Sequence, residues 1–210
     1  MIVLVCLCWS GAWGQQLFSL FESLPDSAVM RLSKSQRQRI IQNFKSGKTD
    51  FDEDLFFRLH TVDHSNGFLG MDGAFEGVWQ MCYWNLPEKP KKLVCVYGEG
   101  CGPVCDIIQF DFYIFDDQGI RPISLSEVVP QYAELEQRFF EQSPEEAYRL
   151  LEENDMVVSL RHFIPRRGKD ILVRFGDQAL SSGDYRDYMK GDKVKLIWEQ
   201  GTFRVGEAFW

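Results

Sequence analysis

Two cysteines stand in a segment whose composition suggests redox chemistry. Cys101 and Cys105 flank Gly-Pro-Val, whereas thiol oxidoreductases place only Gly-Pro between their cysteines. A redox cysteine also lies where a strand leads into a helix, because the helix N-terminus lowers the thiol pKa. Here the motif leads into residues 107–115, where apolar and polar residues alternate as in a strand. We therefore interpret the two cysteines as a structural staple of a loop.

Histidine spacing suggests a second chemistry, metal binding. His60 and His64 are four residues apart, a spacing that binds zinc from one face of a helix, but the glutamate of the zinc-protease motif is missing. Their segment has the pattern of a strand and a turn, and His162 lies in a separate strand. The acidic residues 50–54 lack the glycine of a calcium loop. We therefore expect no metal and no cofactor, and the sequence identifies no catalytic residue.

Aromatic residues suggest binding rather than catalysis. The chain has 17 Phe, 7 Tyr and 6 Trp, and most must be buried because aromatic side chains carry large apolar areas. In the predicted strand 78–84, Trp79 and Tyr83 share one face while Trp84 lies on the other. Two apolar faces cannot both be solvated, so a helix or a partner covers one of them. We take Trp79, Tyr83 and Trp84, with Pro103 of the nearby loop, as a candidate binding surface.

Residue periodicity predicts the elements that position these side chains. Apolar residues recur with helical spacing at 17–24 and 33–47. From residue 55 to 115 the period changes to two, as in half-buried antiparallel strands. Helical patterns return at 126–151, and strands resume from residue 156.

These elements predict an α+β fold. We expect an antiparallel, largely meander sheet of about eight strands, with short N-terminal and central helices packed on one face. The sequence has no internal repeat and no long linker, so residues 15–210 are predicted to form a single domain.

The N-terminal residues resemble a secretory signal peptide. Residues 2–9 form an uncharged apolar run that is shorter than the roughly 20 residues needed to span a bilayer. Small residues, Ala12 and Gly14, precede Gln15 at the positions that signal peptidase prefers. We predict that residues 1–14 are a signal peptide and that the mature chain is periplasmic or secreted. The alternative is a buried first strand.

Net charge restricts the partners. The chain has 23 Lys and Arg against 31 Asp and Glu, a net charge of -8. This excess of acidic residues argues against a nucleic-acid partner, because proteins bind nucleic acid through a basic face. It also argues against electrostatic docking on anionic lipid. No segment after the N-terminal run is apolar enough for an integral membrane span.

Export would place the cysteines in an oxidising compartment. Two of the six lie in the predicted signal peptide, and four remain. About the turn 85–91, Cys82 falls almost opposite Cys95, and Cys101 and Cys105 lie symmetrically in the next hairpin loop. Of the three pairings that four cysteines allow, we favour two disulfides, Cys82–Cys95 and Cys101–Cys105.

Three segments, taken in order, resemble one family. They are Leu-Phe at 17–18 with Leu-Pro-Asp-Ser at 24–27, Val-Trp-Gln-Met at 78–81, and Cys95 followed by Cys-Gly-Pro-Val-Cys-Asp at 101–106. Over about residues 17–125 the chain resembles the exported Bacteroidales proteins termed domain of unknown function 3256. The resemblance implies the cell envelope of a Gram-negative bacterium of the Bacteroidota, and it brings no catalytic residue.

The sequence therefore predicts an exported protein that acts by binding. The expected contact surface is the loop 99–106 with the aromatic strand beside it, and the partner is an unknown protein or another component of the cell envelope. The alternative is an envelope enzyme, a hydrolase or a thiol-disulfide protein, with a site assembled from distant residues. A third alternative is a scaffold subunit of an envelope complex.

Overall fold

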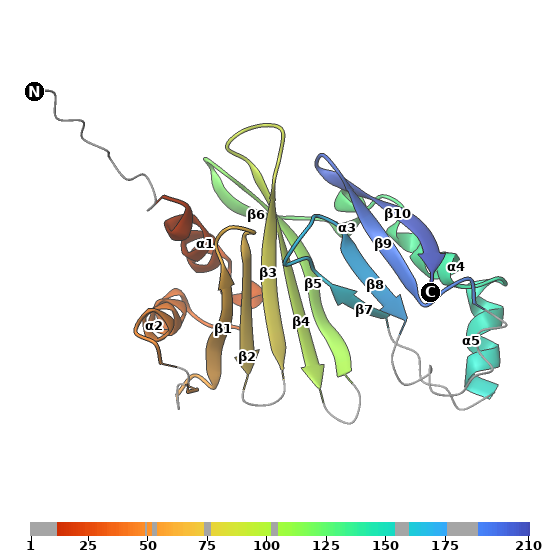
Figure 1. Cartoon of the computed structure of the whole chain (residues 1–210), viewed down its shortest axis with the longest axis horizontal. Helices are drawn as coiled ribbons and strands as arrows, with labels where there is room; N and C mark the ends of the chain where they lie inside the picture. Colours follow the sequence, from red (N-terminus) through yellow and green to blue (C-terminus); the bar gives the residue numbers. More distant parts are fainter. Residues whose placement is uncertain are drawn as a thin grey trace, which may run out of the picture.

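The chain folds into two antiparallel sheets that pack face to face, with helices on the outer side of the larger sheet and at one side of the sandwich (Figure 1). The computed structural model describes residues 12–48, 50–51, 54–73, 77–101, 105–153, 160–175 and 189–210. The α+β class and the antiparallel arrangement that the sequence predicted are confirmed.

The larger sheet is a six-stranded meander in which each strand pairs with the next one in sequence. Its strands are β1 (Phe57–Asp63), β2 (Phe68–Gly73), β3 (Val78–Asn85), β4 (Lys92–Cys101), β5 (Cys105–Asp116) and β6 (Gly119–Ile123). The Asn66-Gly67 turn joins β1 to β2, as its residue types predict, because Gly67 has a positive φ of 67°. The predicted meander is therefore confirmed.

A second, four-stranded sheet corrects the prediction of one sheet with about eight strands. It contains β7 (Leu160–Phe163), β8 (Ile171–Phe175), β9 (Lys193–Glu199) and β10 (Thr202–Phe209), so the described residues form ten strands in two sheets. The alternating pattern identifies a strand but not its partner. The helical segment between β6 and β7 takes the chain away from the first sheet, and the later strands pair among themselves.

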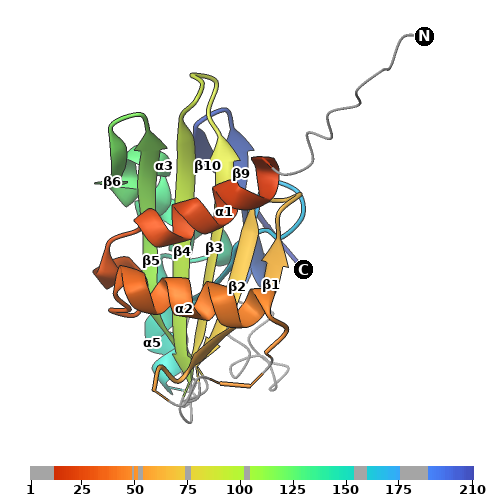
Figure 2. The same cartoon turned by 90° about the vertical axis from the view of Figure 1, so that its left-hand side faces the viewer.

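The helices also differ from the prediction, because they do not all lie on one face. Helices α1 (Ala12–Ser23) and α2 (Lys34–Lys45) cover one face of the large sheet (Figure 2). The remaining helices are α3 (Leu125–Val128), α4 (Leu135–Phe139) and α5 (Pro144–Glu153). Both α3 and α4 lie behind the second sheet in Figure 1 and contact β10. Pro144 begins α5, as a proline at the first helical position predicts.

A buried arginine ties the N-terminal helices together. Only 2% of Arg37 is exposed. Its guanidinium donates hydrogen bonds to the carbonyl oxygens of Glu22 and Leu24, at 3.1 and 2.9 Å, and to that of Leu32. It also pairs with Asp26 at 3.0 Å. Arg37 therefore satisfies the carbonyls at the end of α1, which lack partners within the helix.

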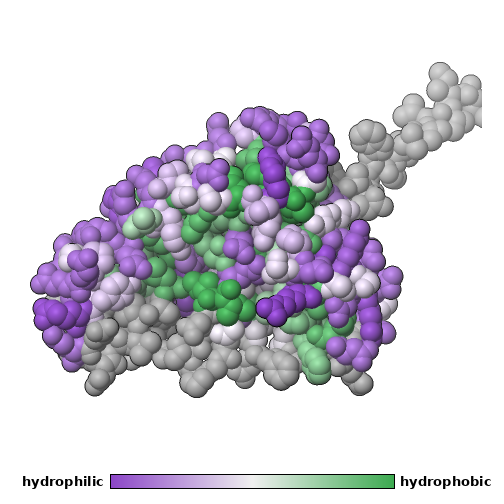
Figure 3. All heavy atoms as spheres, turned by 180° about the vertical axis from the view of Figure 1, so that it is seen from behind, coloured by the Kyte–Doolittle hydropathy of each residue, from purple (hydrophilic) through white to green (hydrophobic). Residues whose placement is uncertain are grey.

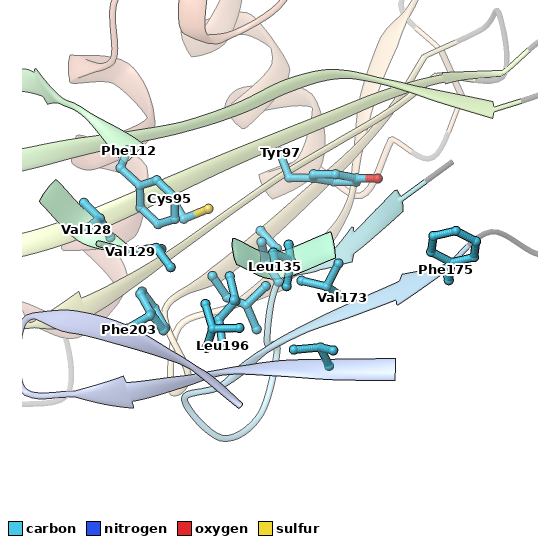
Figure 4. Close-up of a cluster of buried hydrophobic side chains, with 14 of the residues drawn as sticks. Cys95, Tyr97, Phe112, Val128, Val129, Leu135, Val173, Phe175, Leu196 and Phe203 are labelled. Carbon is cyan, nitrogen blue, oxygen red and sulfur yellow. The ribbon is translucent and has the colours of Figure 1, made fainter. Parts of the chain in front are cut away.

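The large sheet separates two hydrophobic cores. Successive residues of β3 alternate between them, so that Trp79 and Met81 face α1 and α2 while Cys82 and Trp84 face the second sheet. Figure 4 shows Cys95 and Phe112 of the first sheet opposite Leu196 and Phe203 of the second. Both apolar faces of the aromatic strand are thus covered by the chain itself.

Seen from behind, the molecule shows hydrophobic atoms in its middle, between hydrophilic flanks (Figure 3). Some apolar side chains of β5 and β6 are only partly buried where they pack against the core between the two sheets. They include Phe110, Ile114 and Ile123. In the described part of the chain, no helix is both long and apolar enough to cross a membrane.

Candidate ligand-binding cleft

The structure separates the four residues of the predicted binding surface. Trp79 is 1% exposed beneath α1 and α2, and its indole N–H donates to the Ala28 carbonyl at 2.8 Å. Trp79 is therefore a core residue, not a contact residue. Pro103 lies outside the described residues. Tyr83 and Trp84, at the end of β3, line a cleft at this end of the sandwich, where Tyr83 packs against the core beneath α1 and α2 and Trp84 belongs to the core between the sheets.

The cleft has a volume of about 220 Å³ and opens between two connections, the β1–β2 turn and the β7–β8 loop. Its principal lining residues are Asn66, Gly67, Tyr83, Trp84, Lys169 and Trp198. They come from the β1–β2 turn, the end of β3, the β7–β8 loop and β9, so the cleft lies where the two sheets meet at one end. Such junctions between structural layers are common positions for ligand sites.

Two tryptophans form the floor of the cleft. Trp84 and Trp198 stack with ring centroids 5.5 Å apart and 22° between their planes. Phe203 packs edge-on against both, with centroids 5.1 Å away. The Trp84 indole N–H donates to the Lys169 carbonyl at 2.9 Å, so its polar atom is satisfied. These contacts fix both rings, and because Trp84 is buried, the accessible part of the pair belongs mainly to Trp198.

A glycine shapes the wall beside Tyr83. A Cβ atom on Gly67 would lie 2.6 Å from Cε1 of Tyr83, closer than any side chain tolerates. Glycine therefore lets the tyrosine ring lie flat against the turn. Burial raises the pKa of the Tyr83 phenol. The hydroxyl is therefore neutral at physiological pH, where it can both donate and accept hydrogen bonds.

A buried lysine lies behind the same ring. The Lys92 ammonium is 4.4 Å from the centroid of Tyr83 and donates a hydrogen bond to Oδ1 of Asn85, which also lines the cleft. Desolvation lowers the pKa of Lys92. The ring face of Tyr83 thus helps to hold a cation in the protein interior.

Polar contacts connect the two walls of the cleft. Asp63 accepts hydrogen bonds from the backbone N–H and the side-chain amide of Asn66, at 3.1 and 3.0 Å. It also pairs with Arg166 of the β7–β8 loop at 3.2 Å. These contacts, with the Asn66 amide contributing most, lower the pKa of Asp63. Asp63 therefore links the turn and the loop that border the cleft.

The cysteines occupy the positions that hairpin geometry predicted. Cys82 lies directly opposite Cys95 on β3 and β4, and Cys101 lies opposite Cys105 at the end of the β4–β5 hairpin. Cys82 and Cys95 are buried free thiols in this structure, and burial raises the pKa of Cys95 well above its usual value. The side chains of Cys101 and Cys105 lie outside the described part. Both disulfides remain predictions.

The three histidines do not meet. His60 bulges from β1, with Nε2 3.4 Å from Asp72, whereas His64 packs edge-on against Phe18. His162 is on β7 in the other sheet. Among the described residues, no three His, Cys, Asp or Glu side chains are grouped to hold a metal ion.

One buried polar cluster has the residue types of an enzyme site. The Tyr132 hydroxyl is 2.8 Å from Nε2 of His162, and an ion pair of 2.7 Å joins Glu99 to Arg161 beside it. Desolvation lowers the pKa of His162 to about 4. However, His162 is only 3% exposed and its ring is 4.2 Å from that of Phe110, so no substrate reaches it in this structure. We interpret the cluster as a polar part of the core.

Comparisons with models of protein families, with curated proteins and with solved structures found no match for this chain. Only the geometry of the cleft therefore supports a ligand site. The sequence pointed to Tyr83 and Trp84 but not to Trp198, which lies on β9 of the second sheet, or to Lys169, which lies in the β7–β8 loop. The only signal for Trp198 was its place on the apolar face of β9, which it shares with Val194 and Leu196.

Proposed function

We propose that this chain is an exported binding protein of the bacterial cell envelope that holds a small ligand in the cleft. The single observation that carries the proposal is the stacked pair Trp84 and Trp198, which come from different sheets and line the cleft. A site whose rings are already fixed loses little entropy when a ligand binds. Rigid aromatic floors with a few polar groups at the rim are typical of ligand sites.

The lining residues favour binding over catalysis. The ionisable side chains among the described lining residues are Tyr83 and Lys169, and neither has the nearby general base that an activated nucleophile requires. Ser65 supplies a hydroxyl, but no histidine or carboxylate lines the described cleft. The chemistry present is hydrogen bonding from amides, hydroxyls and one ammonium, above an aromatic floor.

The size of the cleft limits its ligand. A volume of about 220 Å³ is below the roughly 300–1,000 Å³ of sites for drug-sized molecules. We therefore infer a ligand the size of one sugar or one amino acid, or the end of a longer chain. Its flat apolar face would lie on Trp198, and its polar groups would meet Asn66 and Lys169.

We also propose that the protein lies outside the cytoplasm. The signal-peptide pattern of residues 1–14 and the resemblance to the exported Bacteroidales family both support a periplasmic or secreted protein of a Gram-negative envelope. Mass spectrometry of the protein recovered from its native cells tests this part, because cleavage would leave Gln15 as the first residue. A retained leader would contradict export through this signal.

An NMR titration tests the cleft directly, because the chain contains its own control. Trp84 has its indole N–H at the cleft, whereas the Trp79 indole is buried beneath α1 and α2. We expect a small sugar, amino acid or dipeptide from an envelope panel to shift the Trp84 and Trp198 signals and to leave Trp79 unchanged.

A matched pair of variants completes the experiment. Lys169→Ala removes an ammonium from the cleft while its backbone carbonyl stays available to Trp84, and Lys34→Ala removes one from the exposed start of α2. We expect Lys169→Ala alone to weaken the binding of the panel compound. If no compound shifts Trp84, or if Trp79 shifts equally, the cleft is not the binding site.

A further inference from the structure

A buried lysine beside the cleft is held by neutral groups. Lys92 is 6% exposed, and its ammonium contacts Oδ1 of Asn85 and the face of the Tyr83 ring. In the described part of the chain, no carboxylate pairs with it. Lysine is rarely buried without a paired charge, because removing a charge from water is costly. Tyr83 and Asn85 both line the cleft, so this unbalanced charge lies behind the cleft wall.

A second lysine lines the cleft itself. Lys169 is an exposed residue of the β7–β8 loop. Its backbone carbonyl accepts a hydrogen bond from the Trp84 indole, which ties this part of the loop to the cleft floor. Among the described residues, none forms a hydrogen bond or an ion pair with the Lys169 ammonium. This cation is therefore available to a ligand.

Two carboxylates lie in or next to the connections that border the cleft, and both have other partners. Asp63 accepts from Asn66 and pairs with Arg166. Asp170 accepts a hydrogen bond from the backbone N–H of Trp198 at 3.1 Å. Neither lines the cleft, and its described lining residues include no aspartate or glutamate. The positive charge of the cleft is therefore not cancelled by a carboxylate in its wall.

Two side-chain amides of the wall have their orientations fixed by these charged groups. Oδ1 of Asn85 accepts from Lys92, which leaves the Asn85 amide N–H groups as donors. The side-chain amide of Asn66 donates to Asp63 at 3.0 Å, which leaves the Asn66 carbonyl oxygen as an acceptor. A carboxylate only accepts hydrogen bonds, whereas a hydroxyl also donates them. The wall can therefore serve a carboxylate and a neighbouring hydroxyl or amide N–H together.

We propose that the ligand of the cleft is a small carboxylate whose negative charge is balanced by Lys169 and Lys92, an inference that rests on the proposed binding function. Hydrogen bonds to a charged acceptor are roughly twice as strong as those between neutral groups. A ligand with an ammonium group would find no carboxylate in the described wall. A sugar acid has the required chemistry, with a flat ring for Trp198, and so does the carboxyl end of a peptide chain.

Three sugars that share one ring test the charge. Glucuronate carries a carboxylate, glucose is neutral and glucosamine carries an ammonium. Each is titrated into the full chain while NMR follows the indole signals of Trp84 and Trp198, with the buried Trp79 as the internal control. We expect glucuronate to bind at least about tenfold more tightly than glucose, because its charge strengthens the hydrogen bonds that it accepts. Glucosamine should bind more weakly than glucose.

Two peptide-like compounds identify the source of the carboxylate. N-acetylalanine has a carboxylate and no ammonium, whereas alaninamide has an ammonium and no carboxylate. We expect N-acetylalanine to bind more tightly than alaninamide. Tighter binding of N-acetylalanine than of glucuronate assigns the site to the end of a peptide chain, and the reverse order assigns it to a sugar acid. Both orders support a carboxylate ligand.

Variants of the chain separate a direct contact from the general field of the loop. K169Q removes the ammonium that lines the cleft, and R167Q removes an exposed cation of the same loop that does not line it. We expect K169Q to weaken glucuronate binding by about tenfold and R167Q by about twofold or less. K92M replaces the buried ammonium with an apolar side chain. It should weaken the binding of glucuronate and leave that of glucose unchanged.

The proposal is overturned if glucose or glucosamine binds as tightly as glucuronate, or if K169Q and R167Q lose affinity equally. With either result the cleft still binds a ligand, so the proposed function stands. If no compound shifts Trp84 or Trp198 relative to Trp79, the proposed function fails as well. Because Lys169 is exposed, K169Q tests the carboxylate even if K92M does not fold. A folded K92M protein that binds glucuronate as wild type does would overturn the part assigned to Lys92.

Discussion

Trp84 on β3 and Trp198 on β9 belong to different sheets, yet their rings lie 5.5 Å apart and nearly parallel. The contact joins residues that are 114 positions apart in the sequence. It serves both the packing of the sheets and the floor of the cleft. Removing either ring therefore tests the architecture and the site together.

Trp84→Ala should lower the free energy of unfolding by about 3–5 kcal/mol, because it removes a large side chain that is only 5% exposed. Trp84→Phe should cost less, since it keeps part of the stack. Urea unfolding of each variant measures the difference. Trp210→Ala is the control, because Trp210 is half exposed and its loss should change stability by about 0.5 kcal/mol or less. Equal losses for Trp84→Ala and Trp210→Ala would contradict the packing described.

Gly67→Ala should destabilise the protein for two reasons, a positive φ and a collision with Tyr83. Gly168→Ala is matched to it, because Gly168 also has a positive φ but has nothing within 4 Å of a new Cβ. We expect the Gly67 variant to lose about 1–3 kcal/mol more than the Gly168 variant. In a Tyr83→Ala background, Gly67→Ala should cost no more than Gly168→Ala does. If Gly67→Ala costs as much in the Tyr83→Ala background as in wild type, the ring is not the obstacle.

Acid should destabilise the fold through His162. Its pKa is about 4 in the folded protein and about 6.5 when unfolded, so the unfolded state binds more protons between these values. Stability is therefore full above pH 6.5 and falls by about 3 kcal/mol as the pH drops to 4. Urea unfolding at several pH values, with His162→Phe as the comparison, measures this contribution. The variant should lose that part of the pH dependence, and an unchanged profile would assign it to other groups.

Arg37→Leu should destabilise the protein by about 3 kcal/mol or more, because it leaves three backbone carbonyls without their donor. Arg37→Lys should not restore stability, since an ammonium cannot reach partners in several directions as a guanidinium does. The control is Arg39→Leu, which alters a half-exposed arginine of the same helix. Thermal unfolding followed by circular dichroism compares the three variants, and recovery by Arg37→Lys would show that charge alone suffices.

Protein recovered from an oxidising compartment should contain disulfides. We expect Cys82–Cys95 and Cys101–Cys105, because each pair is in register across a hairpin. Peptide mapping without reduction identifies the pairs. Reduction of Cys82–Cys95 should lower stability by about 3 kcal/mol, as expected for a closed loop of this length. If Cys82 and Cys95 are free in protein recovered from that compartment, the predicted disulfide is wrong and the two thiols contribute only to core packing.

Local patterns predicted the first sheet well and the second sheet poorly. The alternation in residues 55–115 and the Asn66-Gly67 turn depend on neighbouring residues, so β1 to β6 follow from the sequence. The strands β7 to β10 form a separate sheet because the helical segment before them carries the chain away from the first sheet. The periodicity of the residues does not contain this information. Alternation places Trp79 and Trp84 on opposite faces of one strand, but it does not show which layer covers each face. For the same reason, the partnership of Trp84 with Trp198 was not predictable.

The order of the layers affects how the chain can fold during synthesis. Helices α1 and α2 emerge first, but their apolar faces pack on strands β1 to β5, which come later. Each strand of the meander can then pair with the one before it, so that most of the large sheet grows through local contacts. The second sheet closes the other face last. Until β3 and β4 have formed, the apolar faces of α1 and α2 have no docking surface in their own chain and are exposed to association with other chains.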